Sequence, residues 1–406
     1  MLSDHRHGFL FVITNAVYIT FGLVTSVIGV IIDKFATQYH VSLQVAALLP
    51  FAFYLSYGLF SIPFGIIMDR LGARTVLILG MILMTLGCLF LYLFDNYILV
   101  ITMIFLSGIG VTAIQTAGNP FIRVLDVPAR YTANLTIIIG VGALGYAFSP
   151  MLVPWIQAKG LPWSYVYFVF SMISFVLLLL MLFAKMPEIK LVEEERVNAG
   201  AIRSLIREPV IILYTLGIFL YVGGEVGTSS YIIVFMERIH HFGSHISLWK
   251  SGTFMNLAFP STVALVLGLF WLLQAIGRLV TGPLMKTVSP RKLFIIHSAG
   301  TCLMILAAVF SPPPIALVAF ALTGYFTCTS FTSIFSAAIQ SFDKYHGTIS
   351  GILCTAIVGG AVTGYLVGAV GNVFNMKAAM MINFLAFLYV FFLAVFGKGR
   401  LDLSES

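Results

Sequence analysis

Long apolar runs separated by short polar loops dominate the hydrophobic pattern of this chain. The runs are about 20 residues or longer, the length that an α-helix needs to cross a hydrocarbon core about 30 Å thick. The pattern predicts twelve membrane-spanning helices, near residues 8–32, 43–68, 75–94, 97–120, 131–157, 162–185, 208–234, 258–283, 291–310, 313–341, 346–372 and 376–397. We therefore predict an all-α membrane protein.

The longest charged stretch, AKMPEIKLVEEERVNAGAIRSLIREP, lies between the sixth and seventh predicted spans. Its proline and three consecutive glutamates are typical of a linker between two membrane halves. We predict an N-terminal six-helix half over 1–185, a cytoplasmic linker over 186–207 and a C-terminal six-helix half over 208–406. The loops GIIMDRLGART and GRLVTGPLMKTVSPRKLF echo each other after spans two and eight, which indicates two pseudo-symmetric halves.

Composition supports a membrane protein, because 60% of the residues are hydrophobic and only 9% are charged. The first apolar run lacks the short h-region and cleavage site of a signal peptide, so we expect it to remain as a helix. The net charge of +7 comes from basic residues scattered over short loops, which does not indicate a nucleic-acid partner. The four cysteines lie inside spans without metal-ligand spacing, so we expect no metal site.

The basic residues predict the orientation in the membrane. With the N-terminus inside, 16 of the 22 Lys and Arg residues fall in cytoplasmic loops and tails, 5 fall on the opposite side, and Arg278 lies within a span. Cytoplasmic loops carry an excess of Lys and Arg. We therefore expect a multi-pass protein of the cell (inner) membrane, surrounded by the lipid bilayer, with both termini cytoplasmic.

Several sequence segments resemble a known family. The residues Gly65, Asp69, Arg70, Gly72 and Arg74 resemble the loop motif of the major facilitator superfamily, where glycines allow close helix approach and charged residues latch cytoplasmic helix ends. Longer segments resemble the fucose permease branch: QTAGNPFIRVL (115–125), YVGGEVGTSSY (221–231), GRLVTG (277–282) with SPRKL (289–293), SIFSAAI (333–339) and IVGGAVTG (357–364). The resemblance implies a symporter of a hexose, or of a deoxyhexose such as fucose, driven by protons or in some relatives by sodium.

The chain departs from that branch at the positions of its acids. The fucose permease carries one acid in helix one and another in helix four, whereas helix one has none here and Gln115 stands at the helix-four position. Glu225 in helix seven matches branch members that carry glutamate in YVGAEV. The resemblance therefore leaves a proton site in the C-terminal half.

Glu225 is the only carboxylate well inside an apolar span. An ionised group at that depth costs at least a few kcal/mol, which favours a function for its charge or proton. We predict that it binds and releases a coupling proton, with a structural hydrogen bond to a neighbouring helix as the alternative. Gly223, Gly224 and Gly227 beside it predict a break or bend in the helix.

A sugar site needs side chains that donate and accept hydrogen bonds, together with an aromatic surface. The candidates for substrate binding are Gln115, Asn119, Trp271, Gln274, Asn15 and Tyr18. The alternatives are interhelical hydrogen bonds for the polar residues and a lipid-facing or packing role for the tryptophan. Arg278, within about two turns of the cytoplasmic end, is expected to snorkel or to join the cytoplasmic latch.

The sequence contains no P-loop, nucleophile elbow or dinucleotide fingerprint in a strand-to-helix setting, so we expect neither an enzyme nor ATP-driven transport. We predict a monomeric secondary active transporter that imports a monosaccharide with protons by alternating access. No cofactor is expected beyond a coupling proton or sodium ion. Three alternatives remain open: an uncoupled sugar facilitator, an exporter of amphipathic compounds, and a sensor that binds ligand without moving it.

Overall fold

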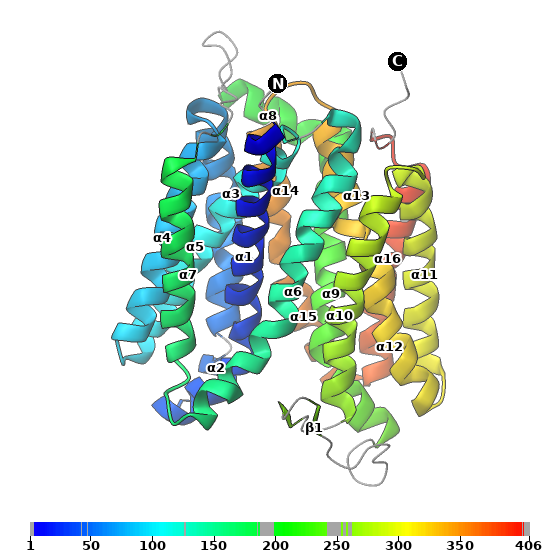
Figure 1. The fold of residues 1–406 in the computed structure, drawn as a ribbon. Coiled ribbons are helices and arrows are strands. Elements are labelled where there is room, and N and C mark those ends of the chain that lie inside the picture. Colours follow the sequence, from blue (N-terminus) through cyan, green and yellow to red (C-terminus); the bar gives the residue numbers. More distant parts are fainter. Residues whose placement is uncertain are drawn as a thin grey trace.

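The computed structural model describes residues 4–41, 43–46, 48–125, 127–184, 186, 199–241, 253–254, 257–258, 262–399 and 401, and it forms a bundle of long helices (Figure 1). The elements are α1 (Asp4–Tyr39), α2 (Leu43–Ala46), α3 (Leu48–Leu71), α4 (Ala73–Leu93), α5 (Tyr97–Ile122), the 3₁₀ helix η1 (Pro128–Arg130), α6 (Tyr131–Ala158), α7 (Tyr165–Phe183), α8 (Ala199–Arg207), α9 (Pro209–His240), β1 (Thr253–Phe254), β2 (Leu257–Ala258), α10 (Thr262–Leu284), α11 (Pro290–Phe310), α12 (Pro313–Thr327), α13 (Ser330–Gln340), α14 (His346–Thr355), the 3₁₀ helix η3 (Ala356–Val358), α15 (Gly359–Val373) and α16 (Met376–Phe396).

The prediction of twelve spans is confirmed, since the described residues contain 12 helical segments that are long and apolar enough to cross a membrane. The tenth span consists of α12 and α13, and the eleventh consists of α14, η3 and α15. The predicted start of span eight at residue 258 was wrong. Leu257–Ala258 pairs with Thr253–Phe254 in a short antiparallel hairpin, and α10 begins at Thr262.

The two halves repeat one packing pattern, which confirms their pseudo-symmetry. In the first half α1 packs on α6, α3 on α5 and α4 on α7; in the second half α9 packs on α15, α10 on α12 and α11 on α16. Contacts of α3 with α14 and of α6 with α10 join the halves. The predicted boundaries of the halves stay a prediction, because most of the linker at 186–207 lies outside the described residues.

The beginning of α1 and the end of α16 lie at the same end of the bundle, called here the termini end (Figure 1). The outer surface carries exposed apolar side chains, among them Phe183 at 85%, Tyr365 at 76% and Phe396 at 71% exposure. Such a surface fits hydrocarbon and would be unfavourable in water. The protein is therefore a multi-pass membrane protein whose polar side chains gather inside the bundle.

Candidate functional site

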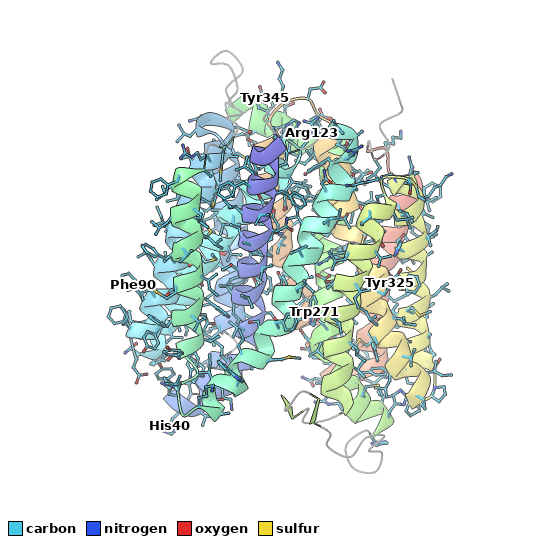
Figure 2. All side chains as sticks on the ribbon, in the orientation of Figure 1. His40, Phe90, Arg123, Trp271, Tyr325 and Tyr345 are labelled. Atoms are coloured by element: carbon cyan, nitrogen blue, oxygen red, sulfur yellow. The ribbon has the colours of Figure 1, made fainter. Side chains whose placement is uncertain are left out.

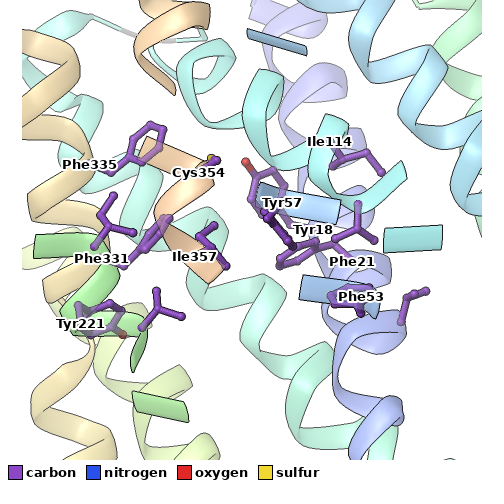
Figure 3. Packing of buried hydrophobic residues seen from close by; sticks show 14 of the residues in the cluster. Tyr18, Phe21, Phe53, Tyr57, Ile114, Tyr221, Phe331, Phe335, Cys354 and Ile357 are labelled. Atoms are coloured by element: carbon purple, nitrogen blue, oxygen red, sulfur yellow. The ribbon is translucent and has the colours of Figure 1, made fainter. Parts of the chain in front are cut away.

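A cavity of about 760 Å³, including the part open to solvent, lies between the two halves. Figure 3 shows Tyr18, Phe21 and Tyr57 of the first half on one side, and Tyr221 and Phe331 of the second half on the other. The polar lining consists of Thr25, Gln115, Glu225, Gln274, Arg278 and the tyrosines Tyr18, Tyr54, Tyr57, Tyr146 and Tyr221.

Glu225 is the centre of the polar cluster in the C-terminal half. One of its carboxylate oxygens, Oε1, accepts hydrogen bonds from the hydroxyl of Tyr221 and from Nε2 of Gln274. Nη2 of Arg278 lies 3.8 Å from the same oxygen. The carboxylate thus has two donors and one cation beside it at the wall of the cavity. Oε1 of Gln274 is buried and has no hydrogen-bond partner among the described residues.

Helix α9 presents Glu225 to the cavity while its opposite face packs tightly. The helix runs unbroken from Pro209 to His240, so the predicted break at the glycines was wrong, while the alternative of a bend stays a prediction. A side chain at Gly223 would collide with Thr363, and one at Gly227 would collide with Asn383. These glycines therefore allow α9 to approach α15 and α16, which fixes the rotation that directs Glu225 inward.

Arg278 occupies a different place from the one expected. It was predicted to snorkel or latch near the cytoplasmic end, but the residue is buried and its side chain lines the cavity. Its Nε donates to the backbone oxygen of Cys328 at 3.3 Å, and Nη2 lies 3.5 Å from the Tyr221 hydroxyl. The placement in the latch was wrong because the carboxylate of Glu225 on the neighbouring helix draws the guanidinium inward.

The N-terminal half contributes amide and phenol groups to the cavity. Gln115 lines the wall, and its Oε1 accepts a hydrogen bond from the hydroxyl of Tyr57 at 2.7 Å. Tyr18 also lines the wall and donates its hydroxyl hydrogen to Oδ1 of Asn119 at 2.6 Å. The structure therefore brings Gln115 and Tyr18 to the cavity as substrate-binding candidates, while Asn119 lies behind Tyr18, fully buried.

Asn15 does not reach the cavity. Its Nδ2 donates to the backbone oxygen of Phe11 at 2.7 Å, one turn earlier in α1, and Asn15 is absent from the cavity wall. Of the two candidates in α1, Tyr18 therefore lines the cavity and Asn15 does not. An asparagine in a membrane helix can satisfy its side-chain donor with a backbone carbonyl of its own helix, as Asn15 does here.

Aromatic rings form the rest of the wall. Trp271 of α10, near mid-height in Figure 2, stacks on Tyr146 of α6 with ring centroids 5.8 Å apart and an interplanar angle of 20°. This stack crosses the boundary between the halves, so Trp271 belongs to the cavity as predicted. Sequence reasoning missed Tyr54, Tyr57, Tyr146 and Tyr221. Only Tyr221 carried a usable signal, because it precedes Glu225 by four residues and therefore shares its helical face.

The loop residues after α3 lie at the termini end. Asp69 accepts hydrogen bonds from the backbone nitrogens of Gly347 at 2.9 Å and Thr348 at 2.7 Å, and from the Thr348 hydroxyl at 2.6 Å. Gly65 packs so closely on Gly347 that a side chain would collide with its backbone. These contacts join the two halves at the start of α14. The latch role of the motif itself stays a prediction.

The other latch residues act within the first half or at its surface. Nη2 of Arg74 donates to the backbone oxygen of Leu182 in α7 at 2.8 Å. Gly72 has a φ of 87°, a conformation that favours glycine, and it joins α3 to α4. Arg70 is exposed at the same end of the bundle. Among the described residues no group of three or more His, Cys, Asp or Glu side chains is placed to hold a metal ion.

Two similar six-helix halves around a central polar and aromatic cavity define a membrane transporter. The sequence profile described as Major Facilitator Superfamily matches residues 14–260 and 259–402 of the chain. The chain therefore belongs to the major facilitator superfamily, a family of transporters and not of enzymes.

Known proteins of this superfamily resemble the chain over nearly its whole length. The glucose/galactose transporter of Brucella abortus biovar 1 (strain 9-941) is 23% identical, with 98% of this chain and 96% of that protein covered. The crystal structure of the E. coli fucose:proton symporter FucP matches with a TM-score of 0.80 and 20% identity, covering 97% of this chain and 100% of FucP. The proton:xylose symporter XylE matches with a TM-score of 0.76 and 12% identity, covering 98% of this chain and 97% of XylE. The two structural matches show a common fold.

Proposed function

We propose that this protein is a secondary active transporter that imports a hexose or deoxyhexose by alternating access, with Glu225 carrying the coupling proton. The observation that carries the proposal is the cluster in which Tyr221 and Gln274 donate to one oxygen of Glu225 while Arg278 faces it. A carboxylate held by exchangeable partners can bind a proton, release Arg278, and so link its charge to the state of the cavity.

The lining of the cavity supports a sugar as the substrate. Gln115 and Gln274 reach it from opposite halves, and each amide both donates and accepts hydrogen bonds. The rings of Tyr146 and Trp271 supply an aromatic surface for the apolar face of a pyranose. The names of the relatives, which refer to glucose, galactose, fucose and xylose, agree with this substrate class.

The orientation and state of the protein follow from the same proposal. We propose that the protein lies in the inner membrane of a cell with both termini in the cytoplasm, because the sequence assigns 16 Lys and Arg residues to loops and tails of that side and 5 to the other. Hydrogen bonds that Thr348 donates to Asp69 and that Thr132 donates to Ser336 hold the halves together near the termini end. The structure then corresponds to a state closed toward the cytoplasm. One monomer suffices, because its own two halves enclose the cavity.

The experiment is uptake of labelled hexoses and deoxyhexoses into proteoliposomes under an inward proton gradient. The wild type should accumulate sugar, whereas Glu225→Gln should exchange sugar without accumulating it. Glu208→Gln is the matched control, because Glu208 lies on the surface at the start of the same helix α9. If the wild type moves no sugar, the substrate class is wrong; if Glu225→Gln accumulates sugar like the wild type, the coupling residue is wrong.

An uncoupled facilitator is the second candidate, because Gln115 stands in the N-terminal wall of the cavity where the fucose permease has an acid. In the described part of that wall the polar groups are hydroxyls and an amide. Uptake that equilibrates sugar and ignores both proton and sodium gradients would select this alternative. A sodium gradient that drives accumulation without a proton gradient would instead identify sodium as the coupling ion.

A further inference from the structure

Five buried polar side chains face each other across the boundary between the halves, between the cavity and the termini end. We call them the polar seam: Thr132 and Thr136 of α6, and Thr332, Ser336 and Gln340 of α13. The residues recur every four positions on each helix, so each set forms a line along one helical face. At most 5% of any of these residues is exposed.

Hydrogen bonds across the boundary hold the polar seam closed. Thr136 donates its hydroxyl hydrogen to Oγ1 of Thr332, and Thr132 donates to Oγ of Ser336, both at 2.9 Å. Nε2 of Gln340 donates to Oγ1 of Thr132 at 3.3 Å. These contacts join α6 of the first half to α13 of the second half. Separation of the two halves at this end therefore has to break them.

The chemistry of the polar seam suits an interface that opens. If the boundary were apolar, separation of the halves would expose apolar surface to water, which is unfavourable. A pair of hydroxyl groups instead exchanges its mutual hydrogen bond for hydrogen bonds to water, which costs little net free energy. A water molecule, or a hydroxyl group of a ligand, can replace either member of each pair as the hydrogen-bond partner of the other. The side chains of the polar seam carry no charge, so they would give an ionic ligand no counter-charge.

A free donor lies beside the polar seam. Asn119 is fully buried, and its Nδ2 has no partner among the described residues. Tyr131, the residue before Thr132, donates its hydroxyl hydrogen to the backbone oxygen of Asn119 at 3.1 Å, which links Asn119 to the start of α6. Asn119 also shares a face of α5 with Gln115, four residues nearer the cavity. A buried donor without a partner is costly in this state and gains one when a ligand arrives.

We infer that Asn119 and the polar seam form a second binding station, which takes an uncharged polyhydroxylated ligand on its way between the cavity and the termini end. The inference rests on the proposed sugar transport and adds a site to it. In the present state the side chains of the polar seam bind each other. Once the halves separate, the hydroxyl groups of the seam and the side-chain amide of Asn119 bind the hydroxyl groups of the substrate. The side chains of the polar seam offer an amphipathic ion no charge to pair with.

The first test uses a reversible cross-link. Thr132→Cys/Ser336→Cys is made after replacing Cys88, Cys302, Cys328 and Cys354 by alanine, and Thr85→Cys/Ser174→Cys is the matched control. Thr85 and Ser174 form a buried hydroxyl pair at 2.8 Å within one half, between α4 and α7. Oxidation of the seam pair should lower sugar counterflow by about tenfold or more, reversibly, and leave the control pair active. Counterflow that survives a seam cross-link verified by mass spectrometry would overturn the inference.

The second test separates binding from packing. Asn119→Leu should raise the KM for sugar presented at the termini end by about tenfold and change the KM at the opposite end by less than about twofold. Asn383→Leu is the control, because Asn383 is equally buried but lies in α16 behind α9. Equal changes of both KM values in Asn119→Leu, or none, would overturn the binding station. Failure of the proposed function is distinct, since the wild type would then carry no sugar in either direction.

Discussion

Oε1 of Glu225 lies 3.8 Å from Nη2 of Arg278, and the two side chains are 12% and 7% exposed at the wall of the cavity. The two groups lie on different helices, α9 and α10, 53 residues apart in sequence. A carboxylate and a guanidinium this deep in a membrane protein neutralise each other. Loss of one partner therefore leaves the other as an uncompensated charge.

The pair predicts a non-additive effect on stability. Arg278→Gln should lower the free energy of unfolding by about 3 kcal/mol, because removing one partner strands the Glu225 carboxylate. The double variant Glu225→Gln/Arg278→Gln should be more stable than Arg278→Gln alone, since neither charge then remains. Melting temperatures of the wild type, both single variants and the double variant, measured at one pH, complete the cycle. Additive changes would show that the two groups do not interact.

The same substitution by leucine should change the KM for sugar strongly at Gln115 and weakly at Asn15. Gln115→Leu should raise the KM for sugar by about tenfold, because a hydroxyl of the substrate loses its partner at the wall. Asn15→Leu should change it by less than about twofold, because Asn15 donates to its own helix and lies outside the wall. Initial rates of uptake over a range of sugar concentrations measure both values. A larger effect of Asn15→Leu would contradict the placement of the cavity.

We expect the hydrogen bonds that Asp69 accepts to favour the closed state at the termini end over the open state. Asp69→Asn replaces an acceptor oxygen that faces the donors of Thr348, so it should shift the balance toward the open state by about tenfold or more. Thr348→Val removes a single bond and should shift it less. Spin labels at the exposed positions Thr75 and Lys292, in opposite halves, report the change as a longer distance. An unchanged distance distribution in Asp69→Asn would refute the closing role of these bonds.

Gly227 and Gly29 predict opposite effects of the same substitution. Gly227→Ala should lower the free energy of unfolding by about 1–3 kcal/mol, because the added methyl group collides with Asn383 of α16. Gly29→Ala meets no atom within 4 Å and should leave stability unchanged or raise it by up to about 1 kcal/mol, because alanine favours a helix. Thermal unfolding in one detergent compares the two. Equal destabilisation would show that the close approach of α9 and α16 does not depend on Gly227.

Much of the candidate site was predictable because membrane burial makes polar residues informative. Glu225, Gln274, Trp271, Gln115 and Tyr18 were singled out within apolar spans, and all five line the cavity. Burying an amide or a carboxylate in hydrocarbon costs free energy, so such a residue within a span indicates a function in the cavity. Tyrosine gives a weaker signal, since its ring packs anywhere in a bundle, and four tyrosines of the wall were missed for that reason.

Two other predictions failed because partners from distant segments decide where a side chain points. Position along the helix placed Arg278 near the membrane surface, but Glu225 on α9 draws its guanidinium to the cavity. The glycines of span seven predicted a break or a bend; the break is absent, and the glycines permit close packing of an unbroken helix on α15 and α16. Neither outcome is visible in the local sequence, because both depend on which helix lies opposite.

The sequence by itself determined the twelve spans and their repeat as two halves. A run of about 20 apolar residues has no stable alternative to a membrane helix, because lipid offers no partner for a free backbone group. Only the tertiary structure decided that Glu225 meets Arg278, that Tyr57 meets Gln115, and that Thr132 meets Ser336. These pairs depend on the rotation and depth of helices far apart in the chain. Both are set by close packing between helix surfaces, which the pattern along one helix does not contain.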